Sequence, residues 1–93
     1  MIIGLLTLEL YLPESNSLKT KRLALKSLKD RAKNKFNVSI AEIGHTDLWQ
    51  RSTIVFACVG NEVKIVNQTL NGVMSVALQN PYIEIIDSKL EIL

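Results

Sequence analysis

Basic side chains crowd one short stretch of this 93-residue chain. Eight of its eleven lysine and arginine residues lie between Lys19 and Lys35, where Asp30 is the only acid. Residues 17–36 therefore carry a formal charge of +7 and the rest of the chain carries −5, although the net charge is only +2. Cations gathered on one element attract anionic partners such as polyphosphates. The first chemistry that the sequence indicates is therefore phosphate binding.

The spacing of these cations predicts how they would meet phosphates. On a helical wheel four of them fall within about 60° of one another, beside the apolar face. Lys19, Lys21 and Arg22 crowd the first turn, where the helix dipole disfavours cations. A helix start also offers free N–H groups to anions, and serine hydroxyls stand next to it. The predicted phosphate-binding residues are Ser15, Ser17, Lys19, Lys21, Arg22, Lys26, Lys29 and Lys33.

Two other interpretations of the basic run stay open at this stage. It could be a solvated lysine-rich face that keeps an apolar small protein in solution. It could also attract another anion or an acidic protein. Aromatic residues make up only 5% of the chain, and no RNP-type aromatic pattern appears in the expected strands. Any RNA binding is therefore expected to depend on the backbone and to show little sequence specificity.

A second polar cluster runs from Glu42 to Arg51 and holds the only histidine and the only tryptophan. Glu42, His45 and Asp47 could supply metal ligands, or His45 could move a proton under the influence of Asp47. A structural loop is the simpler interpretation, because no second histidine is present. Tryptophan is enriched at interface hot spots. The predicted partner-binding residues are His45, Asp47, Trp49 and Arg51, and no cofactor is expected.

Composition limits the class of protein. Ninety-three residues make one domain over 1–93, and 47% of them are apolar, which is much for a small domain to bury alone. The excess apolar surface favours a homodimer. No signal peptide or membrane span is expected. A disulfide framework is not expected either, because Cys58 is the single cysteine. A cytoplasmic protein is the simplest expectation.

Hydrophobic periodicity predicts the elements that must position these residues. Leu6, Leu8, Leu10 and Leu12 share one face of a first strand, and Ser17 is a natural N-cap for the helix that follows. Asn61 is expected to cap a second helix, in which Gly72 would permit a close contact or a break. The predicted elements are strands over 2–12, 38–43, 49–59 and 82–93 and helices over 18–36 and 62–79.

This order, βαββαβ, is that of an α+β ferredoxin-like fold. Both helices are then expected on one face of a four-stranded antiparallel sheet. The other face is left open and still carries apolar residues, which is a second argument for a homodimer.

Three blocks of sequence resemble the YlxP-like family, the domain of unknown function numbered 503. They are SLKTKR at 17–22, FNVSIAE at 36–42 and HTDLWQR at 45–51. The resemblance implies a small bacterial cytoplasmic protein with a ferredoxin-like fold. It also implies a gene commonly found beside translation initiation and ribosome maturation genes. It brings no catalytic residues, because no activity is established for the family.

Three hypotheses about function follow. The leading one is a non-enzymatic RNA- or ribosome-associated module that docks phosphates on the first helix. The second is a homodimeric protein-interaction module that uses the open sheet face and the Trp49 hairpin. The third is a small enzyme or metal protein built on Glu42, His45, Asp47 and Arg51.

Overall fold

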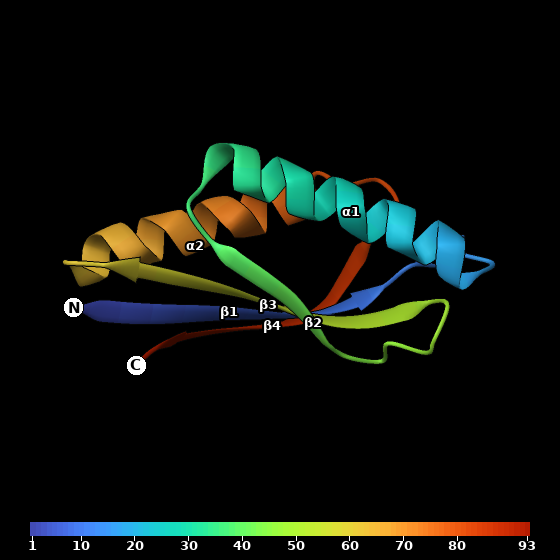
Figure 1. Cartoon of the computed structure of the whole chain (residues 1–93), viewed down its shortest axis with the longest axis horizontal. Helices are drawn as coiled ribbons and strands as arrows, with labels where there is room; N and C mark the ends of the chain where they lie inside the picture. The colour runs from blue at the N-terminus through green and yellow to red at the C-terminus, as the bar shows by residue number, and fades with distance from the viewer.

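The computed structural model describes residues 1–93, and its six elements follow the predicted order (Figure 1). The strands run in the order β2-β3-β1-β4, and every neighbouring pair is antiparallel. Both helices lie on one face of the sheet. The ferredoxin-like prediction is therefore confirmed. The elements are β1 (Ile2–Tyr11), α1 (Leu18–Lys35), β2 (Ser39–Gly44), β3 (Arg51–Gly60), α2 (Val63–Leu78) and β4 (Glu84–Ile92).

The core lies between the helices and the two central strands. Leu6, Leu8 and Leu10 of β1 are buried, as alternation along a strand with one covered face requires. Their covering comes mainly from α2, which contacts β1, β3 and β4. None of the helices is long and apolar enough to cross a membrane.

Both ends of α1 have local causes. The side chain of Ser17 accepts a hydrogen bond from the Thr20 N–H at 3.0 Å, so the predicted N-cap is confirmed. The helix ends at Lys35, and the ring of the next residue, Phe36, lies over Gly72 of α2. A Cβ at position 72 would come within 2.3 Å of that ring, so the glycine permits the close contact that the sequence predicts.

The start of α2 differs from the prediction. The helix begins at Val63, its N-cap is Glu62, and no side chain caps it. The expectation that Asn61 caps this helix is wrong, because Asn61 lies one residue outside the cap position. Val63 at this end is 45% exposed, whereas Val66, Leu70 and Val73 further along the helix are buried.

Charge is separated across the sheet. Strands β2 and β4 form its two edges. Helix α1 is joined to β2 by an ion pair between Lys21 and Glu42, whereas α2 packs toward β4. Strand β4 carries three of the acids, Glu84, Asp87 and Glu91. An anionic polymer would therefore be drawn to the α1 side and away from the β4 edge.

Candidate nucleic-acid interface

Five cations form a row along one flank of α1, which we call the basic stripe: Lys19, Arg22, Lys26, Lys29 and Lys33. They span about 80° of the helix circumference and about 21 Å along its axis. Four of the five are exposed and Lys29 is half-buried. The helical row predicted from the sequence therefore exists, with its side chains on the surface.

Most cations of the basic stripe have no carboxylate partner. Lys26 lies 2.7 Å from Asp30 one turn along the same helix, and both side chains are more than half exposed. An exposed pair of this kind contributes little stability and gives way readily to a stronger anion. The other four cations of the stripe make no ion pair. No carboxylate from another element neutralises this flank.

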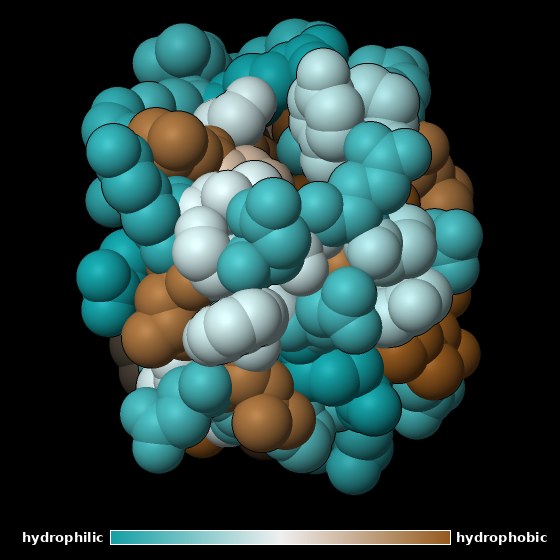
Figure 2. All heavy atoms as spheres, turned by 90° about the vertical axis from the view of Figure 1, so that its right-hand side faces the viewer, coloured by the Kyte–Doolittle hydropathy of each residue, from teal (hydrophilic) through white to brown (hydrophobic).

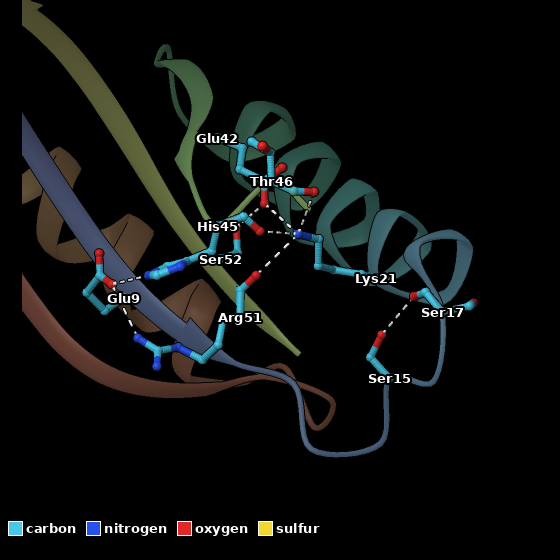
Figure 3. Close-up of polar contacts among 9 residues, drawn as sticks. All are labelled: Glu9, Ser15, Ser17, Lys21, Glu42, His45, Thr46, Arg51 and Ser52. Carbon is cyan, nitrogen blue, oxygen red and sulfur yellow. Dashed lines mark hydrogen bonds and ion pairs between the residues drawn. The ribbon is translucent and has the colours of Figure 1, made fainter. Parts of the chain in front are cut away.

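Lys21, one of the predicted phosphate ligands, does not belong to this surface. Its side chain is only 1% exposed. The ammonium lies 3.0 Å from Glu42 Oε2, and it donates to the backbone carbonyls of His45 at 2.9 Å, Thr46 at 3.3 Å and Arg51 at 3.2 Å (Figure 3). A phosphate would have to displace this whole set of acceptors.

The hydroxyls of the two predicted serines also make hydrogen bonds within the protein. Ser15 is only 4% exposed, and its hydroxyl donates to the Ser17 carbonyl at 3.2 Å. The predicted phosphate ligand Ser15 is therefore buried and not on the surface of the stripe. The Ser17 hydroxyl accepts from one of the N–H groups that an anion at the helix start would need. Of the predicted phosphate-binding residues, the cations of the basic stripe are those whose side chains remain free for a ligand.

The contacts of Lys21 form a structural unit that we call the lysine clasp. Glu42 comes from β2, and its Oε2 also accepts from the hydroxyl of the fully buried Ser52 at 2.6 Å. His45 has a φ of 57°, in the left-handed region, at the start of the loop over residues 45–50, and its carbonyl is one of the acceptors of the ammonium. One buried cation therefore joins α1, β2, the loop and β3.

The lysine clasp was missed by the sequence analysis, although a signal was present. Lys21 lies four residues before Leu25, seven before Leu28 and eleven before Ala32, all of which are buried. These intervals place it on the apolar side of the helical wheel. Helical periodicity does not, however, predict which residues elsewhere in the chain are the partners of Lys21.

The side chains of the predicted loop residues lie outside the clasp, although the carbonyls of His45 and Arg51 belong to it. Glu9 of β1 approaches His45 Nε2 at 3.9 Å and Arg51 Nη2 at 3.6 Å (Figure 3). Glu42 instead turns inward to Lys21, so the three side chains suggested as metal ligands, Glu42, His45 and Asp47, do not converge. Trp49 is 55% exposed at the loop surface.

Comparisons with known proteins agree with the family resemblance of the three sequence blocks. The model of the family described as "Protein of unknown function (DUF503)" matches residues 3–90. The chain is 39% identical over 83 residues to "Uncharacterized protein YlxP" of Bacillus subtilis (strain 168), which covers 89% of this chain and 90% of that protein. The chain therefore belongs to the DUF503 family, whose function is unknown.

Proposed function

We propose that this protein is a non-enzymatic, cytoplasmic RNA-binding module that docks the phosphates of structured RNA, including RNA of the ribosome, on the basic stripe. The observation that carries the proposal is the row of five cations, four of them without an ion pair. The acidic strand β4 forms the edge of the sheet opposite β2, and its negative charge would orient the molecule on a polyanion. The association of family genes with translation genes agrees with such a partner.

The composition of the stripe favours contacts to the RNA backbone. Helix α1 has no aromatic residue, so the stripe has no platform on which bases could stack. Lysine ammonium groups bind phosphates as point charges and carry no base information. The stripe is therefore expected to bind many structured RNAs with similar affinity.

Reversing two charges of the stripe tests this proposal. The double variant Arg22→Glu/Lys26→Glu should bind a labelled RNA hairpin at least about tenfold more weakly at low salt, since two phosphate contacts become repulsive. Binding is measured by fluorescence anisotropy. The matched control is Lys64→Glu/Lys89→Glu, which changes the net charge equally at exposed positions of α2 and β4.

The control separates a local surface from a general charge effect. If both double variants lose the same affinity, the RNA responds to net charge alone and the stripe is not the docking surface. If neither loses affinity, the proposal is wrong. Circular dichroism and a thermal melt show that each variant is folded before binding is compared.

We propose, as a second candidate, that two copies associate through the open face of the sheet. The side chains of Leu5, Val55 and Ala57 lie half-exposed there, on the two central strands, with no helix over them (Figure 1). Val59 on the same face is 65% exposed. An apolar centre of this kind on a monomer is typical of a protein interface.

Sedimentation velocity tests the second candidate. We expect a dimer at micromolar concentration and a folded monomer for Val55→Glu, because a charge would be buried at the centre of the contact. The control is Thr20→Glu, on an exposed part of α1. A wild-type protein that stays monomeric at high micromolar concentration would contradict this candidate.

A further inference from the structure

The lysine clasp fixes a loop whose outer side carries the only tryptophan of the chain. Three of the acceptors of Lys21 are backbone carbonyls, two of them in the loop and one at the first residue of β3. Leu48 N–H also donates to the His45 carbonyl at 3.1 Å, which closes a turn inside the loop. Trp49 is therefore presented by backbone that is already ordered, and a ligand would not have to order it.

A shallow hollow opens beside Trp49. Its lining is Asp47, Leu48, Trp49, Gln50 and Arg51. The carboxylate of Asp47 and the indole N–H of Trp49 make no hydrogen bond within the protein. Arg51 approaches Glu9 at 3.6 Å, and its Nε is buried without a partner, so this atom is not offered to a ligand. The hollow thus combines an aromatic plane, the free carboxylate acceptor of Asp47 and the free indole N–H of Trp49.

These groups match a nucleobase better than a phosphate. A phosphate would be repelled by Asp47, whereas a base is neutral and offers a π-face with donors and acceptors at its edge. Stacking on an exposed aromatic side chain requires an unpaired base. The chemistry of the hollow therefore selects an unpaired nucleotide over the backbone of a duplex.

The hollow and the start of the basic stripe lie at the same end of the molecule. Lys21, which holds the loop, is the direct neighbour of Arg22 in the first turns of α1. The start of α1 and the 45–50 loop both lie at the end of the molecule that faces the viewer in Figure 2, where apolar side chains stand among hydrophilic ones. An RNA whose phosphates rest on Lys19 and Arg22 would therefore reach the end of the molecule that carries the Trp49 loop.

We infer that the hollow beside Trp49 is a second RNA subsite, which takes one unpaired base of a hairpin loop or bulge while the basic stripe holds the adjoining phosphates. This inference rests on the proposed RNA-binding function. It adds selectivity for RNA that joins paired and unpaired nucleotides, which the stripe alone would not provide.

The fluorescence of the single tryptophan reports directly on whether a base is bound at this subsite. Two RNAs with equal numbers of phosphates are titrated into the protein, one a blunt duplex and the other a hairpin with an unpaired loop. Both should bind, but only the hairpin should quench the Trp49 fluorescence. The hairpin should also bind more tightly, by about 5- to 100-fold, which is the range that one stacked base supplies.

Variants assign the difference to the indole ring. Trp49→Ala should bring hairpin affinity down to that of the duplex, and Trp49→Phe should keep most of the difference, as followed by anisotropy of labelled RNA. The control is Tyr82→Ala, which removes another aromatic ring, 61% exposed, from a separate hollow beside Leu23 and Ala24. It should leave the preference unchanged.

The outcomes separate this inference from the function on which it rests. If both RNAs bind through the stripe with equal affinity and no quenching, the subsite is absent while the proposed function stands. If Trp49→Ala abolishes self-association and leaves RNA binding unchanged, the loop is a protein contact and the inference is wrong. If neither RNA binds, both the function and the subsite fail.

Discussion

Lys21→Met is expected to lower the free energy of unfolding by about 3–5 kcal/mol, a large part of the total stability of a small domain. The substitution removes the cation but leaves the Glu42 carboxylate and three carbonyls without their donor. An unpaired carboxylate in a largely buried position costs more than the lost attraction itself. Urea denaturation, followed by circular dichroism, measures the change.

The control is the same substitution at an exposed lysine of the same turn. Lys19→Met should change the free energy of unfolding by less than about 0.5 kcal/mol, as is usual for surface positions. The double variant Lys21→Met/Glu42→Met should recover only part of the loss, because the three carbonyls have still lost the ammonium, although the His45 carbonyl keeps the Leu48 N–H. A Lys21→Met protein within about 1 kcal/mol of the wild type would refute the structural role of the clasp.

The affinity for structured RNA is expected to fall by about 500-fold when the salt concentration is raised from about 50 to about 200 mM. Each neutralised phosphate adds about −0.9 to the slope of log affinity against log salt, so five stripe cations predict a slope of about −4.5. Lys21 adds nothing to this slope, because its ammonium is buried. A salt series with a hairpin RNA measures the slope.

The double variant Arg22→Glu/Lys26→Glu should reduce the steepness of this slope by about two, since two phosphate contacts are lost. Lys64→Glu/Lys89→Glu should leave it unchanged. A flat slope for the wild-type protein would mean that few phosphates are neutralised, and the basic stripe would then be an ordinary solvated face.

The lysine clasp gives a physical meaning to the three sequence blocks that indicated the family. Lys21 belongs to the first block, Glu42 ends the second, and the carbonyls of His45, Thr46 and Arg51 belong to the third. The blocks lie apart in the sequence and meet at one buried ammonium. In the third block, the side chains of Asp47 and Trp49 remain on the outside and are available to a partner.

Local regularities in the sequence determined the elements and the stripe. The alternating leucines of β1 and the hydroxyl of Ser17 act through neighbours in the chain, so they could be predicted without tertiary information. The basic stripe could be predicted in the same way, because helical geometry alone places residues three and four apart on one flank.

Only the tertiary structure decided which of the polar residues face water. Ser15 and Lys21 carry groups that normally stay solvated, and they are buried because protein acceptors replace water. The acceptor of Ser15 is the carbonyl of Ser17 two residues on, whereas those of Lys21 come from distant parts of the chain. The partners of Lys21 are 21 to 30 residues away, and no local pattern encodes such a distance. The burial of a charge is a property of the folded neighbourhood, and the sequence of one helix does not contain it.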